Sequence, residues 1–129
     1  MIYADASYFI ALAVKNDRWH RDAIRLRARL EKETLLITHF TLAESVSHVG
    51  GVLGGKAGQR LFRYFLDSCE VVPVDAGLLA AAMVHWLTYD GALSVSDATA
   101  VALMVQRDVD RIVSFDDDYD RVRGIDRLR

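Results

Sequence analysis

The chain has 129 residues, of which 52% are apolar and 26% are charged, so it has the composition of a folded domain and not that of a disordered protein. Its net charge of −2 argues against a protein that coats nucleic acid through overall positive charge. The single cysteine, Cys69, excludes an internal disulfide, and the start of the chain lacks the segments of a signal peptide. We therefore expect one domain over residues 1–129, cytoplasmic and without a membrane span.

Apolar patterning predicts the elements in chain order. Four short β-rich segments predict strands at Met1–Ala4, Leu35–Thr38, Glu70–Val74 and Arg111–Phe115. Apolar residues at helical spacing predict helices around Tyr8–Leu12, Ala23–Leu30, Leu42–Val49, Leu61–Leu66, Leu78–Leu87 and Ala98–Val105. Because strands that alternate with helices form parallel sheets covered on both faces, we predict an α/β fold, with a small, mostly parallel β-sheet flanked by helices on both faces.

Glycine and proline mark two irregular places. Five of the eight glycines fall between Gly50 and Gly58, which predicts a break between two helices. The run Gly50–Lys56 fits the first seven positions of a phosphate-binding loop, but Ala57 replaces the hydroxyl residue that would bind magnesium, and no strand precedes the run. We therefore favour a flexible helix connection there. The only proline, Pro73, predicts an edge position or an irregular strand.

Acidic residues follow the predicted strands. Asp5 comes directly after the first strand and Asp116 directly after the fourth. Glu44 and Asp97 lie in the first turns of two predicted helices. Because ligands of open α/β sheets bind beyond the carboxyl ends of the strands, we expect these four carboxylates to converge.

A cluster of four carboxylates requires protons or a cation, since two unit charges about 4 Å apart repel by roughly 4 kcal/mol at an effective dielectric near 20. Magnesium and manganese are the ions that suit oxygen-only sites. A divalent ion held there would activate water and stabilise charge on a phosphodiester, so the pattern points to phosphodiester hydrolysis.

Each acid also has a purely structural interpretation. Thr41–Glu44 has the form of a capping box, and Ser94–Asp97 resembles the same device. Asp5 and Asp116 are candidates for caps of the elements that follow them. Capping and metal binding do not exclude one another, so the joint pattern carries more weight than any single acid.

At these residues the chain resembles the PIN-domain family, and within it the VapC-type toxins of bacterial toxin–antitoxin pairs. The resemblance covers nearly the whole chain in order, and it rests on Tyr3–Phe9, Ile37–Thr38 with Thr41–Glu44, Leu93–Ala98, Val113–Asp116, and Tyr119 with Gly124–Ile125.

The resemblance implies a parallel sheet flanked by helices and RNA cleavage that depends on Mg²⁺ or Mn²⁺. It implies an acidic site of Asp5, Glu44, Asp97 and Asp116. Our hypothesis is that Asp5, Asp97 and Asp116 hold the metal while Glu44 completes the shell. The resemblance adds supporting roles for Ser7 and Ser114, and Asp118 is an alternate for the fourth acid. It further implies a homodimer and an antitoxin whose C-terminal segment covers the site.

A basic run adds candidate RNA contacts. Between Lys15 and Glu33, seven basic residues accompany four acidic ones, and Arg18, Arg21 and Arg25 are the candidates for holding flanking phosphates.

Other interpretations remain or fail. A receiver domain would need an aspartate pair after the first strand and a late lysine, and both are missing. The histidines show no ligand spacing, and we expect surface or half-buried positions for them. Six aromatic residues are core candidates by default, with lining a groove for a partner helix as the alternative role for some of them: Trp19, Trp86, Phe40, Phe62, Tyr64 and Phe65. The serious alternative is a catalytically silent PIN-like module that binds RNA or protein, because sequence alone does not show turnover.

Overall fold

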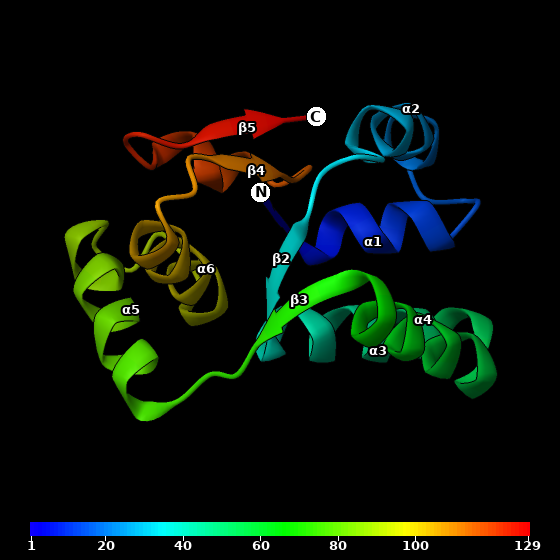
Figure 1. The fold of residues 1–129 in the computed structure, drawn as a ribbon, viewed down its shortest axis with the longest axis horizontal. Coiled ribbons are helices and arrows are strands. Elements are labelled where there is room, and N and C mark those ends of the chain that lie inside the picture. Colours follow the sequence, from blue (N-terminus) through cyan, green and yellow to red (C-terminus); the bar gives the residue numbers. More distant parts are fainter.

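The computed structural model describes residues 1–129, arranged as a central sheet between two layers of helices (Figure 1). The elements in chain order are β1 (Ile2–Ala4), α1 (Ala6–Ala13), α2 (His20–Leu30), β2 (Leu35–Thr38), α3 (His39–Leu53), α4 (Gly55–Ser68), β3 (Cys69–Val72), α5 (Ala76–Thr88), α6 (Val95–Arg107), β4 (Arg111–Val113), the 3₁₀ helix η1 (Asp117–Arg121) and β5 (Asp126–Leu128). The predicted alternation of strands and helices is confirmed.

All five strands pair in parallel, in the order β3-β2-β1-β4-β5. The strand predicted over Glu70–Val74 is an edge strand, β3, but it ends at Val72, so Pro73 lies just after the strand and not inside it. The other edge strand, β5, was not predicted. Its residues are Asp126, Arg127 and Leu128, and two charged side chains among three residues leave no apolar pattern to recognise.

Each face of the sheet has its own apolar core, as predicted. Tyr3, Leu36 and Ile112 pack with α5 and α6 on one face. Neighbouring strand residues point the other way, because strand side chains alternate between the faces. Ile2, Ile37 and Val113 accordingly pack with α1, α2 and the buried Phe65 of α4.

The carboxyl-terminal edge of the sheet is where the next elements begin. The α1 helix starts there after β1, α3 starts after β2, and η1 starts after β4. The α6 helix precedes β4 and runs back across the sheet, so its N-terminus also lies near this edge. The parallel topology therefore directs the starts of four helical segments to one place.

The glycine-rich segment is helical except at one residue. The α3 helix ends at Leu53, and the backbone turns at Gly54, whose φ is +99°. The predicted break is confirmed, but it is short. Gly58 of α4 instead permits a close helix crossing, because a Cβ there would lie 3.1 Å from the Val46 carbonyl oxygen and 3.2 Å from Gly50 Cα.

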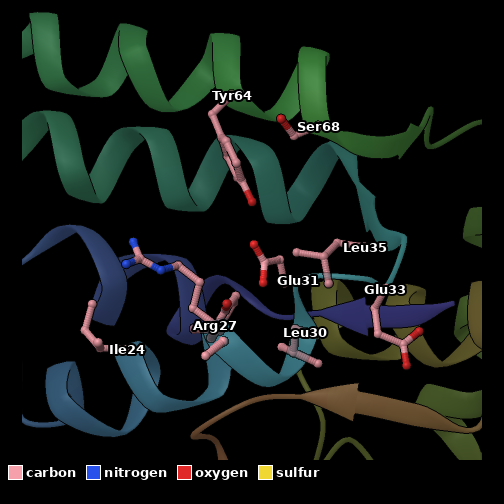
Figure 2. Close-up of a pocket in the computed structure, with 10 residues that line it drawn as sticks. Ile24, Arg27, Leu30, Glu31, Glu33, Leu35, Tyr64 and Ser68 are labelled. Atoms are coloured by element: carbon pink, nitrogen blue, oxygen red, sulfur yellow. The ribbon is translucent and has the colours of Figure 1, made fainter.

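The aromatic residues of α4 are not all in the core. Phe65 is fully buried, but Phe62 and Tyr64 are 39% and 41% exposed, so the default core assignment is wrong for these two. Only one stripe of α4 faces the sheet. Figure 2 shows Tyr64 on the wall of a hollow of about 660 Å³ that is also lined by Ile24 and Arg27 of α2 and by Glu31, which directly follows this helix. No helix of the chain is both long enough and apolar enough to cross a membrane.

Candidate active site

Asp5 is a buried carboxylate at the end of β1, with 8% of its surface exposed. It caps α1, and its Oδ2 accepts hydrogen bonds from the Ser7 amide at 3.3 Å and the Ser7 hydroxyl at 2.6 Å. The Ser114 hydroxyl donates to the same oxygen at 2.9 Å. The predicted capping role is confirmed, and these donors fix the orientation of the carboxylate.

The hydroxyls of Ser7 and Ser114 connect the strand ends. Ser7 Oγ accepts from the Phe115 amide at 3.0 Å, and Ser114 Oγ accepts from the Asp116 amide at 3.0 Å. The two oxygens lie 3.3 Å apart. The loop after β4 is thereby tied to the start of α1, which places Asp116 near Asp5.

Asp97 lies in the first turn of α6. Ser94 caps this helix by accepting from the Asp97 amide at 3.0 Å, as predicted. The Tyr119 hydroxyl donates to Asp97 Oδ1 at 2.9 Å, and it also lies 3.4 Å from Asp5 Oδ1. Tyr119 is 1% exposed, so a buried phenol bridges two of the four acids.

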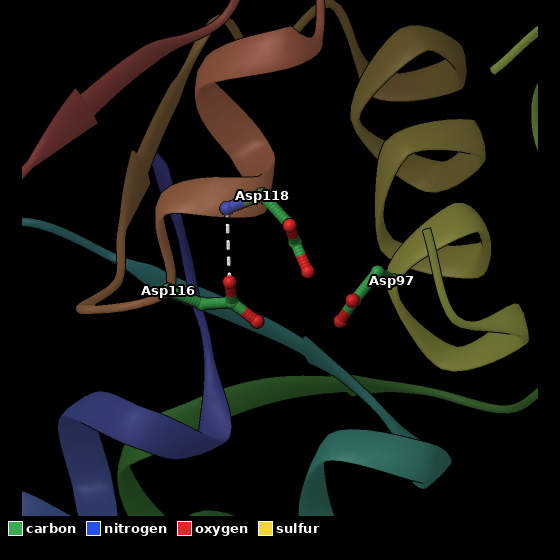
Figure 3. Close-up of side chains that lie close together, drawn as sticks. All are labelled: Asp97, Asp116 and Asp118. Atoms are coloured by element: carbon green, nitrogen blue, oxygen red, sulfur yellow. Dashed lines mark hydrogen bonds between the residues drawn. The ribbon is translucent and has the colours of Figure 1, made fainter. Parts of the chain in front are cut away.

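Asp97, Asp116 and Asp118 form the tightest acidic group. One carboxylate oxygen from each lies within 4.8 Å of the others (Figure 3). Asp116 caps η1 by accepting from the Asp118 amide at 2.9 Å. The short 3₁₀ turn brings Asp118 back beside Asp116, and Asp97 of α6 faces them both.

Glu44 is near this group but differs from its expected setting. Thr38, and not Thr41, caps α3, so the predicted capping box is wrong. The Thr41 hydroxyl is instead 2.6 Å from the hydroxyl of Tyr3. Glu44 projects from the second turn and is exposed. Partial loss of water raises its pKa, and the charges of Asp5, Asp97 and Asp116 raise it further.

The pKa values of two of the aspartates, Asp97 and Asp116, are raised as well. Burial raises the pKa of Asp97, although the hydrogen bond from Tyr119 acts in the opposite direction. Burial also raises the pKa of Asp116, and the neighbouring charges of Asp118 and Asp5 add to the effect. Carboxylates that repel one another in this way gain stability from a bound cation.

The donor set fits a hard divalent ion. Every charged group of the cluster is a carboxylate, no histidine or cysteine joins it, and the spacing permits shared coordination. Of the four acids expected from the sequence, Asp97 and Asp116 have carboxylate oxygens within 4.8 Å of one another. Asp5 is buried beside this pair and accepts hydrogen bonds from Ser7 and Ser114, whereas Glu44 lies at the exposed border of the cluster. Asp118, expected as a supporting residue, is part of the closest group.

The sequence did not predict the contacts that two further residues, Tyr119 and Arg127, make in the site. Tyr119 was recognised only as part of a terminal motif, and its bridging hydroxyl depends on tertiary packing. Arg127 packs under the loop after β4 and donates to the Ser114 carbonyl oxygen at 3.1 Å. Its place in an unpredicted strand concealed it.

The candidate RNA-binding arginines occupy different positions. Arg18 lines a hollow that also contains Asp116. Arg21 and Arg25 lie on the outer surface of α2, where Arg25 forms an ion pair with Asp22. The structure therefore brings only Arg18 next to the acids. The histidines are half-buried or exposed, as expected.

Comparison with known proteins gives a consistent result. The family model described as "PIN domain" matches residues 2–125. Among solved structures, VapC20 of Mycobacterium tuberculosis, described as a toxin that cleaves the sarcin–ricin loop, is 25% identical with a TM-score of 0.83 over 93% of each chain. VapBC2 of Rickettsia felis, bound to promoter DNA, is 15% identical with a TM-score of 0.70, over 99% of this chain and 98% of that one. No curated protein sequence matches this chain.

Proposed function

Because this chain belongs to the PIN-domain family, we propose that it is a metal-dependent endoribonuclease and the toxin of a toxin–antitoxin pair. The observation that carries the proposal is the convergence of Asp97, Asp116 and Asp118 within 4.8 Å beside the buried Asp5. The likeness to VapC20, itself described as an RNA-cleaving toxin, supports RNA as the substrate.

We assign the acids as follows. Asp5, Asp97 and Asp116 would hold Mg²⁺ or Mn²⁺, with Asp118 as a further ligand and Glu44 completing the shell. When bound, the metal supplies positive charge for the phosphodiester and lowers the pKa of water. The protein's part is to hold the carboxylates in fixed orientations around the cation.

The hydroxyl groups orient the acids in this proposal. Ser7 and Ser114 donate to one oxygen of Asp5, and Tyr119 donates to one oxygen of Asp97. The hydrogen bond from Tyr119 favours the charged form of Asp97 and leaves its other oxygen free for a cation, and the serine hydroxyls hold the Asp5 carboxylate in one orientation. Burial and the charges of Asp5 and Asp97 hold the pKa of Tyr119 well above its ordinary value, so its hydroxyl stays a donor.

The deciding experiment is cleavage of a panel of structured RNAs, including a sarcin–ricin loop, with Mg²⁺, with Mn²⁺ and with EDTA. The Asp97→Asn variant serves as the inactive control. Metal-dependent cutting by the wild-type chain that disappears in the variant is the expected result. A folded, partner-free chain that cuts none of them would favour the alternative of a silent binding module.

The toxin role has a separate test. The resemblance of this chain to VapC-type toxins, which pair with an antitoxin, supports an antitoxin partner. In our proposal the antitoxin's C-terminal segment covers the acids, with an arginine paired to the carboxylates. Expression of the chain alone should arrest growth, and expression of Asp97→Asn should not. Normal growth with active wild-type enzyme would remove the toxin role and leave the nuclease.

We also propose a homodimer, on the strength of the resemblance to VapC-type toxins. Light scattering of the purified chain should then give twice the monomer mass of 14.5 kDa. A monomer mass across the accessible concentration range would contradict this.

A further inference from the structure

A second hollow borders the acidic cluster on the side of α2. Its volume is about 390 Å³, and it lies between the segment that leads into α2, the loop after β4 and the end of β5. The residues that line it are Arg18, Trp19, Phe115, Asp116, Asp117, Arg127 and Arg129. Asp116 is shared with the candidate metal site, so whatever occupies the hollow lies next to the reacting centre.

The hollow has an aromatic wall. The rings of Trp19 and Phe115 are stacked, with centroids 5.3 Å apart and planes within 2° of parallel. The guanidinium of Arg18 lies 4.6 Å from the Trp19 ring. Both aromatic residues are half-buried, so each keeps some surface in contact with solvent.

The backbone holds this wall in place. The Trp19 amide donates to Asp17 Oδ1 at 2.8 Å, and the Phe115 amide donates to Ser7 Oγ at 3.0 Å. Ser7 is also the residue that donates to Asp5. One hydroxyl therefore positions both Phe115 and the buried acid.

The arginines of the hollow are of two kinds. Arg127 has a side chain that is only 4% exposed and makes two hydrogen bonds of 2.7 Å to Asp120, so it is fixed in the wall. Arg18 and Arg129 are exposed and form no ion pair with any carboxylate of the chain. Two guanidinium groups are thus free to bind an anion.

We propose that this hollow binds the nucleotide next to the scissile phosphate of a single-stranded RNA, an inference that rests on the proposed nuclease function. The base stacks on Trp19 in place of the Arg18 guanidinium, which moves with Arg129 to the flanking phosphate. Aromatic stacking combined with arginine is how proteins bind unpaired nucleotides, whose faces are accessible only outside a duplex. The carboxylates of Asp116 and Asp117 oppose a phosphate, so binding is stronger when the adjacent metal site is filled.

The test uses Trp19 as its own probe. Trp19 and Trp86 are the only tryptophans, so the Trp86→Phe variant leaves one fluorophore with all the acids in place, and its initial quenching is read before cleavage products form. A short single-stranded oligoribonucleotide added with Mg²⁺ should quench its fluorescence. Arg18→Ala and Arg129→Ala in this background should each raise the Kd about tenfold, whereas Arg60→Ala, on α4, should not change it.

The outcomes separate this inference from the proposed function. Metal-dependent cleavage by the wild type, together with an unchanged Kd in both arginine variants, would contradict nucleotide binding in the hollow. The proposed nuclease function would be retained. Quenching that depends on Arg18 and Arg129, when the wild-type chain never cuts RNA, would support nucleotide binding in the hollow and contradict the proposed nuclease function. Stronger quenching by a perfect RNA duplex than by the single strand would also overturn the inference.

Discussion

The Tyr119 hydroxyl donates a 2.9 Å hydrogen bond to Oδ1 of Asp97, across 22 positions of the chain. A residue of the 3₁₀ segment after β4 therefore contributes to the ionisation of a carboxylate at the start of α6. This hydrogen bond lowers the pKa of Asp97 against the opposing effect of burial. Without it, a larger fraction of Asp97 would carry a proton and be unable to bind a cation.

The first prediction concerns Tyr119→Phe. Removing the hydroxyl should raise the pKa of Asp97 and weaken Mn²⁺ binding, more at pH 5 than at pH 8. We also expect a stability loss of about 1 kcal/mol, because a buried hydrogen bond is lost. Calorimetric titration with Mn²⁺ across this pH range measures the effect. An equal loss of affinity at every pH would show that Tyr119 acts on position alone.

The second prediction concerns the stability of the metal-free protein. The pKa values of Asp97 and Asp116 are raised in the folded state, so folding favours their protonated forms. The associated stability is fully present below the unfolded pKa, about 4. It is lost as the pH rises through the raised folded pKa, because the folded chain then gives up the protons that it held more tightly.

Asp97→Asn should therefore melt higher than the wild type in EDTA at pH 7. A gain of about 3 °C is expected if roughly 1 kcal/mol of repulsion is relieved. The difference should shrink as the pH falls toward 4. Asp67→Asn, which changes an exposed acid of α4, is the matched control and should show no such pH-dependent gain. A melting temperature of Asp97→Asn below the wild type at pH 7 would contradict the repulsion.

The third prediction concerns added metal. Millimolar Mn²⁺ should raise the melting temperature of the wild type, since a ligand at a hundred times its Kd stabilises by about 2.7 kcal/mol. Asp116→Asn and Asp118→Asn should each reduce the shift, and Asp67→Asn should retain it. Thermal unfolding with and without EDTA measures this. If Asp118→Asn kept the full shift in melting temperature, Asp118 would not be a ligand, and the proposed ligands would be Asp5, Asp97 and Asp116.

The fourth prediction compares two substitutions of Asp5. Asparagine can place its amide oxygen where Oδ2 accepts from Ser7 and Ser114, so Asp5→Asn should fold and lose cleavage. Alanine leaves the two hydroxyls without this acceptor, so Asp5→Ala should lose a further 1–3 kcal/mol, roughly, in urea unfolding. Retained RNA cleavage by Asp5→Asn would end the assignment of Asp5 to the site.

The fifth prediction concerns the α3–α4 crossing. Gly58→Ala places a Cβ 3.1 Å from the Val46 carbonyl oxygen, so the helices must separate at a cost of about 1–3 kcal/mol. Gly51→Ala is the control, because its Cβ meets nothing within 4 Å in the helix. It should be neutral or stabilise by roughly 0.5–1 kcal/mol. Equal stabilities of the two variants would show that the crossing is not tight.

Local sequence patterns were sufficient to predict four of the five strands, the helices between them and the positions of the acids along the chain. Asp5 and Asp116 follow strands, and Asp97 follows a capping serine, in patterns set by close neighbours. The fold class follows from the same patterns, because parallel strands with intervening helices have few alternative arrangements. The fifth strand was not predicted, because two of its three residues are charged and only its pairing with β4 defines it as a strand.

Which side chains come into contact depends on the tertiary structure. Ser114 and Asp5 are 109 positions apart and joined by a 2.9 Å hydrogen bond, a distance that no local pattern encodes. The contacts of the Tyr3 hydroxyl with Thr38 and Thr41 likewise join β1 to the start of α3, where Thr38 is the cap. Periodicity reflects burial of neighbouring residues, whereas the Tyr119 bridge and the Trp19–Phe115 stack depend on how separate elements pack.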